Sequence, residues 1–104
     1  MAGKRTTTRP IAIERGSGDV FRDLGFSAAE AANLRLRADL ALRLRQYVER
    51  TGITQAEAAR LLGIRQPRLN ALLRGRLEQF SLDALVNLLS RTGQRVELRV
   101  RRAP

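Results

Sequence analysis

Neither cysteine nor histidine occurs among the 104 residues of the sequence. Their absence excludes disulfides, thiol nucleophiles, histidine-based catalytic triads and most zinc sites. The carboxylates are scattered along charged segments without an obvious acid/base pair, and the Gly16–Gly18 stretch is too short for a phosphate-binding loop. We therefore expect a protein that is not an enzyme and that holds no metal ion or cofactor.

Aromatic residues are also scarce. They make up 4% of the chain, whereas hydrophobic residues, mostly Leu, Ala, Val and Ile, make up 43%. This mixture favours packed helices over a sheet sandwich, and the length suits one domain with one modest core. No apolar run approaches the length of a membrane span, and no hydrophobic segment of a signal peptide follows the basic N-terminus. The sequence predicts a soluble cytoplasmic protein that does not bind membranes.

Positive charge dominates what the sequence does contain. Lys and Arg total 20 against 10 Asp and Glu, a formal net charge of +10, and Lys4 is the single lysine. Arginine suits bidentate contacts to phosphates and to guanine edges. A basic surface that only resists aggregation is the alternative. A membrane surface is less favoured, because no long helix opposes a basic face to a bulky apolar one. The charge favours a nucleic-acid partner.

The chain divides into three predicted parts. Residues 1–17 form a basic arm, which either adds phosphate or minor-groove contacts or stays an unstructured tail. Residues 18–93 form the folded domain, in which the bulky apolar residues of 20–26 anchor the arm. Residues 94–104 form a C-terminal strand and basic tail.

Caps and apolar spacing predict the helices of the folded domain. Ser27 with Glu30 and Thr54 with Glu57 match the capping-box pattern, and Ser81 is a further N-cap. Glycines follow the predicted helix ends. The expected helices cover residues 28–51, 55–62, 66–74 and 82 to just before Gly93.

The periodicity changes after Gly93. Val96, Leu98 and Val100 alternate with charged residues, which is the pattern of an amphipathic strand. A single strand is not stable without a partner. The same strand of a second subunit is the simplest partner, through pairing of Arg95–Arg101, and Ile11–Ile13 is the competing one.

Residues 54–75 have the pattern of a helix-turn-helix. Two short helices that cross steeply need a small residue at the crossing, here Ala59, and a turn residue free to adopt positive φ, here Gly63. A generic helical hairpin shares some of these features. Apolar residues at the required offsets would lock the helices together: Ala58, Leu62, Ile64, Leu69 and Leu72.

The same segment resembles the phage-repressor (Xre) helix-turn-helix family, whose members often read TQ-x-x-x-A-x-x-L-G-[IV]-x-Q. The matching residues here are Thr54, Gln55, Ala59, Leu62, Gly63, Ile64 and Gln66. The resemblance implies a mainly α, lambda-repressor-like bundle of four to five helices that binds operator DNA and becomes nucleoid-associated when bound.

The resemblance also implies a role for individual residues. Gln55 would bind a phosphate at a helix N-terminus, and the second helix would lie in the major groove. Gln66 and Asn70 suit adenine, and Ala71 can contact a thymine methyl. The arginines serve two purposes: Arg65 and Arg68 suit guanine or phosphate, and Arg74 and Arg76 suit phosphate.

Two residues depart from the family pattern. Arg65 stands where relatives often have a Ser or Thr cap, and Pro67 occupies an outward position where many carry a polar reader. Proline is tolerated in a first helical turn but offers no hydrogen bond to a base. The base preference of a relative therefore cannot be transferred to this chain.

Across residues 18–101 the arrangement is similar to the short HigA-type antitoxins of this family. That similarity implies a homodimer that represses its own operon and binds a RelE/HigB-like toxin. Residues 18–26, with Asp19 and Asp23, are either the docking element for the toxin or a segment that only packs onto the domain. The net charge of +10 argues against a basic toxin as partner. A stand-alone Xre-type regulator and a nucleoid or RNA-binding structural protein are the alternatives. Polar readers on the second helix argue against the last of these.

Overall fold

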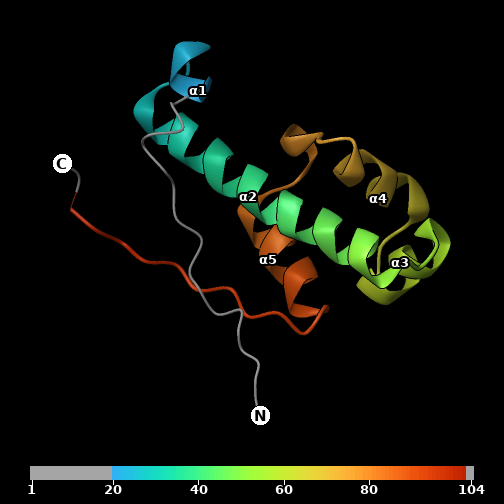
Figure 1. Cartoon of the computed structure of the whole chain (residues 1–104). Coiled ribbons are helices and arrows are strands. Elements are labelled where there is room, and N and C mark those ends of the chain that lie inside the picture. Colours follow the sequence, from blue (N-terminus) through green and yellow to red (C-terminus); the bar gives the residue numbers. More distant parts are fainter. Residues whose placement is uncertain (1–19, 103–104) are drawn as a thin grey trace.

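A computed structural model of the protein describes residues 20–102. The described chain forms five α-helices and one 3-10 turn: α1 (Val20–Asp23), α2 (Ala28–Thr51), α3 (Gln55–Leu62), α4 (Gln66–Leu73), η3 (Leu77–Gln79) and α5 (Leu82–Ser90). Figure 1 shows α2 as the long central helix, with α1 at its N-terminal end, α3 near its C-terminal end and α5 crossing it. The predicted helical bundle is confirmed. The predicted arm and Ile11–Ile13 lie outside the described residues.

The long helix α2 begins and ends where the sequence predicts. The Ser27 hydroxyl accepts a hydrogen bond from the Glu30 amide at 3.2 Å, and the Glu30 carboxylate accepts one from the Ser27 amide at 3.0 Å. Gly52 ends the helix in the left-handed conformation, with φ of 69°. Leu40, Leu44 and Val48 are spaced four residues apart and form the buried stripe of the helix.

A single hydrophobic core joins α2, α3, α4 and α5. Helix α5 packs across α2, and Phe80, which follows η3, fills the space beside them. Aliphatic residues supply almost all of the buried surface, as the composition predicts. The buried core residues are Leu40, Ala41, Leu44, Val48, Ala58, Ala59, Leu62, Leu69, Leu72, Phe80, Leu85, Leu88 and Leu89.

Only one of the two hydrogen bonds of the capping box predicted at Thr54 and Glu57 is formed. The Thr54 hydroxyl accepts a hydrogen bond from the Glu57 amide at 3.1 Å, so Thr54 is the N-cap of α3. The Glu57 carboxylate does not return to the Thr54 amide, because it pairs with the Arg60 guanidinium three residues further along the helix. The Arg60 guanidinium donates two hydrogen bonds to that carboxylate, from Nε and Nη2, whereas the Thr54 amide could donate only one.

The C-terminal strand predicted for residues 94–104 is not formed. Residues 94–102 are extended but belong to no strand in the described part of the chain. A strand is stabilised by a ladder of hydrogen bonds to a neighbour, and no segment between residues 20 and 102 supplies one. Val96 is half-buried against the core, whereas Leu98 is 62% exposed and Val100 is 95% exposed. Leu98 and Val100 of the extended segment are therefore left uncovered by the rest of residues 20–102.

Candidate nucleic-acid interface

Helices α3 and α4 form a helix-turn-helix whose turn depends on one glycine. Gly63 has φ of 74°, a conformation that residues with a side chain adopt only at a cost. In this conformation the Gly63 amide donates to the Arg60 carbonyl at 3.2 Å, and the Ile64 amide donates to the Ala59 carbonyl at 3.0 Å. These bonds satisfy the last carbonyls of α3 and turn the chain toward α4.

Small and aliphatic side chains fill the space between the two helices. Ala58 and Ala59 of α3 are 0% and 4% exposed, and Leu69 and Leu72 of α4 are 0% and 3% exposed. Ile64, in the turn, is half-buried against the same core. Because alanine occupies the buried face of α3, its backbone can approach its neighbours closely. The apolar residues expected to lock the two helices together are thus buried or half-buried, whereas the turn residue Gly63 is exposed.

Arg91 braces the turn from the end of α5. Its Nε donates a hydrogen bond to the Leu61 carbonyl at 3.3 Å, and its guanidinium lies against Gly63. The contact links two parts of the chain that are 30 residues apart. It fixes the helix-turn-helix against the rest of the bundle, so that α4 is held on a rigid support.

The outward face of α4 follows from its register. Successive residues turn by about 100° around a helix, and Leu69 and Leu72 mark the buried side. Pro67 therefore lies at the centre of the opposite face, and Gln66 and Arg68 lie on its two flanks. Ala71 is half-buried and packs against the core. Arg65 is the N-cap of α4 and makes no capping hydrogen bond, as its residue type predicts. Asn70 is half-buried on the same flank as Gln66.

Positive charge surrounds this face. Residues 60–76 contain five arginines and no acidic residue. Arg60 is neutralised by Glu57, but within residues 20–102 no ion pair engages the other four, Arg65, Arg68, Arg74 and Arg76. All four side chains are exposed. Such a field attracts polyanions and needs no change of structure to do so.

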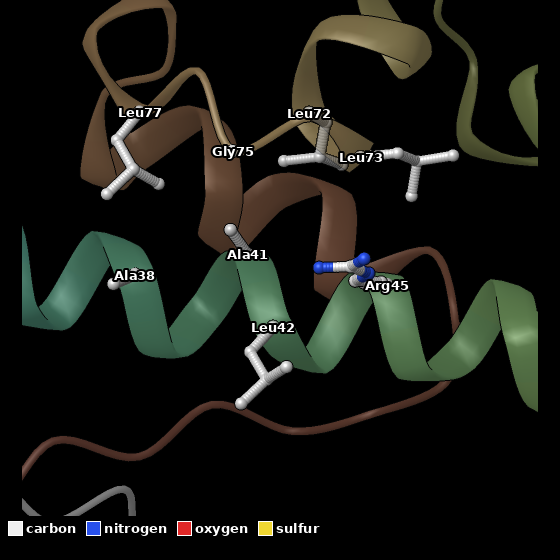
Figure 2. Close-up of a pocket in the computed structure, with 8 residues that line it drawn as sticks. All are labelled: Ala38, Ala41, Leu42, Arg45, Leu72, Leu73, Gly75 and Leu77. Atoms are coloured by element: carbon white, nitrogen blue, oxygen red, sulfur yellow. The ribbon is translucent and has the colours of Figure 1, made fainter.

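The helix-turn-helix also borders a shallow groove on its other side. The groove has a volume of about 220 Å³ and lies between α2 and the chain that ends α4 and leads into η3. Figure 2 shows Leu72 and Leu73 above Ala41 of α2, with Leu42 directed away from them. Arg45 is the one polar side chain among the residues that line the groove, and the others are apolar or glycine. The groove therefore offers fewer groups to orient a ligand than the four arginines around α4 do.

Two other kinds of site are absent from residues 20–102. Between residues 20 and 102 no group of three acidic, histidine or cysteine side chains is placed to hold a metal ion. In the same residues no helix combines the length and the apolar character needed to cross a membrane.

Comparison with known proteins agrees with this geometry. Residues 20–101 match a family of helix-turn-helix domains. A solved structure assigned to the XRE family of transcriptional regulators is 37% identical, with a TM-score of 0.67, over 72% of this chain and 84% of the other. The chain belongs to the XRE helix-turn-helix family. A comparison with curated proteins gives no match.

In this XRE protein the predicted DNA-binding residues gather on α4 and around it. Gln55 is the exposed first residue of α3, Arg74 is the C-cap of α4 and Arg76 precedes η3. Arg68 differs from the others, because its guanidinium is held by residues beyond α4. Two further arginines, Arg37 and Arg91, were not predicted from the sequence, and each has a hydrogen-bond partner 30 or more residues away. No local sequence signal indicates either contact.

Proposed function

We propose that the protein is a sequence-specific DNA-binding repressor that reads the major groove with α4. The observation that carries the proposal is the exposed face of α4, which combines amide and guanidinium side chains with flanking arginines that have no ion pair among residues 20–102. Phosphate binding alone needs only the arginines. Gln66 and Asn70 add the donor–acceptor pairs that distinguish one base pair from another.

Roles follow from the position of each side chain. Gln55, at the positive end of the α3 dipole, contacts a phosphate, as do Arg74 and Arg76 beyond the other end of the motif. Gln66 and Arg68 flank the face that enters the groove and contact base edges. Pro67, at the centre of that face, and the half-buried Ala71 beside it offer only van der Waals contact, for which a thymine methyl is the suitable partner.

Selection from a pool of randomised double-stranded oligonucleotides tests the proposal. We expect the full chain to enrich one sequence and to bind it at least 1000-fold more tightly than random DNA. Gln66→Ala should remove about 1–3 kcal/mol of binding free energy at one base pair only. Arg74→Ala should weaken binding to all sequences, and the slope of log K against log salt concentration should fall in magnitude by about 1. Gln46→Ala, an exposed glutamine on α2, is the control. Equal affinity for every sequence would instead identify a nucleoid or RNA-binding structural protein.

The repressor is proposed to act as a dimer through the extended C-terminal segment. Leu98 and Val100 are exposed on one side of it, and a second copy of the segment would supply the missing hydrogen-bond ladder. To enter successive major grooves on one side of DNA, the two α4 helices of the dimer must lie about 34 Å apart across its two-fold axis.

An antitoxin role is the finer proposal, and a surface at the start of α2 favours it. Val20 and Leu24 are 58% and 69% exposed, and Phe26, whose ring meets Phe21 edge-on, is 39% exposed. These exposed apolar side chains offer a surface for a protein partner. If the protein is an antitoxin, this partner is a toxin, and the repressed operon encodes both proteins.

Capture of the tagged protein from its host, followed by mass spectrometry, tests that role. A stoichiometric small protein encoded by the adjacent gene is expected, and Leu24→Ser should release it while Leu42→Ser, an exposed leucine on α2, should not. Recovery of the protein alone from cells that express the neighbouring genes would identify a stand-alone regulator.

A further inference from the structure

Arg68 of α4 is held in place by two residues outside the helix-turn-helix. Its Cζ lies 4.2 Å from the centroid of the Phe80 ring, so the guanidinium stacks on the aromatic face. Its Nη1 donates a hydrogen bond to the Gln79 carbonyl at 3.3 Å. An arginine that only supplied charge would gain nothing from either contact, since both restrict the side chain to one position and one plane.

The aromatic platform is itself fixed to α2. Phe80 is 1% exposed, and its carbonyl accepts a hydrogen bond from Arg37 Nη1 at 3.3 Å. The same Nη1 donates to the Leu77 carbonyl at 2.9 Å, and Arg37 Nε donates to Asn33 Oδ1 at 2.6 Å. Arg37 therefore fastens η3 and Phe80 to the central helix, and the position of Arg68 is determined by the core of the bundle.

We infer that Phe80 and Arg37 are positioning residues that preset Arg68 as a reader of one guanine. Nη1 of Arg68 is engaged by Gln79, and within residues 20–102 neither Nε nor Nη2 has another partner. Two parallel N–H groups on one edge match the O6 and N7 acceptors of guanine. This inference rests on the proposed major-groove function of α4.

The fixed plane is the reason to assign guanine and not phosphate. Guanine presents its two acceptors in the plane of the base, so a bidentate contact requires the guanidinium to be coplanar with it. A phosphate is tetrahedral and accepts hydrogen bonds from many directions. Stacking on Phe80 also removes rotamer freedom before binding, which lowers the entropic cost of the contact.

The test uses the sequence that the wild-type chain selects from the random oligonucleotide pool. Dissociation constants are measured for this sequence and for versions in which each G·C pair is replaced by A·T. We expect Arg68→Ala to remove the preference for one guanine, which in the wild type is about ten-fold or more. Phe80→Leu, which keeps an apolar side chain but lacks the aromatic face, should reduce the preference for that same guanine. The double variant should equal Arg68→Ala alone.

Leu88→Ala controls for loss of stability in Phe80→Leu. Leu88 lies in the same core, on α5, and is 6% exposed. Its truncation should lower the melting temperature and leave the guanine preference unchanged. Arg37→Gln, which loses the hydrogen bonds to the Leu77 and Phe80 carbonyls without touching the core, should weaken the same preference as Phe80→Leu.

Three results would overturn the inference. If Arg68→Ala weakens every site alike and lowers the salt slope by about 1, Arg68 binds a phosphate. If Arg68→Ala removes the guanine preference but Phe80→Leu and Arg37→Gln retain it, the platform does not position the side chain. If the wild-type chain selects no sequence, the proposed function fails together with the inference.

Discussion

The guanidinium of Arg91 occupies the space that a side chain at Gly63 would need. A Cβ built on Gly63 would lie 3.0 Å from Arg91 Cζ, and Arg91 Nε donates to the neighbouring Leu61 carbonyl at 3.3 Å. Because Gly63 has no side chain, it can adopt the positive φ of the turn, and the Arg91 guanidinium can pack against the turn. Substitution at Gly63 should affect both.

Gly63→Ala is expected to destabilise the fold more than Gly75→Ala does. The two glycines have similar φ values, 74° and 79°, so the backbone cost, about 1–2 kcal/mol, is shared. Nothing lies within 4 Å of a Cβ at Gly75, whereas a Cβ at Gly63 forces the Arg91 guanidinium to shift by a few tenths of an ångström, which weakens its hydrogen bond to the Leu61 carbonyl. Weakening that bond adds up to about 1 kcal/mol. Urea denaturation of both variants measures the difference.

Arg91→Ala provides the control for this comparison. In its background the excess cost of Gly63→Ala over Gly75→Ala should disappear, because no guanidinium remains to be displaced. An excess that persists without Arg91 would show that some other contact restricts the turn.

The turn glycine and the caps could be predicted from sequence because their causes are local. Ser27 and Glu30 satisfy each other within one helical turn, and Gly63 is required by the backbone at its own position. The Arg91 and Arg37 contacts join residues 30 and 40 apart, so they depend on how the helices pack. The predicted strand failed for a similar reason, since a strand also needs a distant partner.

Ala59→Leu is expected to cost about 1–3 kcal/mol of folding free energy by overpacking the core. Ala59 is 4% exposed on the buried face of α3, where added methyl groups have no free space. Ala56→Leu, on the exposed side of the same helix, is the matched control and should change stability by less than about 0.5 kcal/mol. Equal melting temperatures for Ala59→Leu and wild type would contradict this description of the motif.

The α2 capping box makes the stability of the helix start depend on pH. Hydrogen bonds from the Ser27 backbone and side chain hold the pKa of Glu30 below its ordinary value of 4.5. A carboxyl whose pKa is lower in the folded state than in the unfolded state stabilises the fold at pH values above its unfolded-state pKa. That stabilisation is lost as the pH falls through its folded-state pKa. Wild-type α2 should therefore lose helicity at acid pH more than Glu30→Gln does.

Circular dichroism of both proteins between pH 7 and the acid limit of the fold checks this expectation. Glutamine can still accept the hydrogen bond from the Ser27 amide but carries no charge to complement the helix dipole. Wild type should be the more helical protein at pH 7, and the difference should vanish once Glu30 is protonated. A difference that is constant across the titration would show that the charge of Glu30 contributes nothing.

Lysines at Leu98 and Val100 are expected to convert a dimer into a monomer. The two side chains share one face of the extended segment and are its exposed large apolar residues. Charges on that face would repel across a two-fold axis and block strand pairing. Light scattering over a concentration series would report the change in mass. Glu97→Lys adds the same charge, +2, on the other face, so it should remain dimeric; an unchanged mass for the double variant would refute the strand interface.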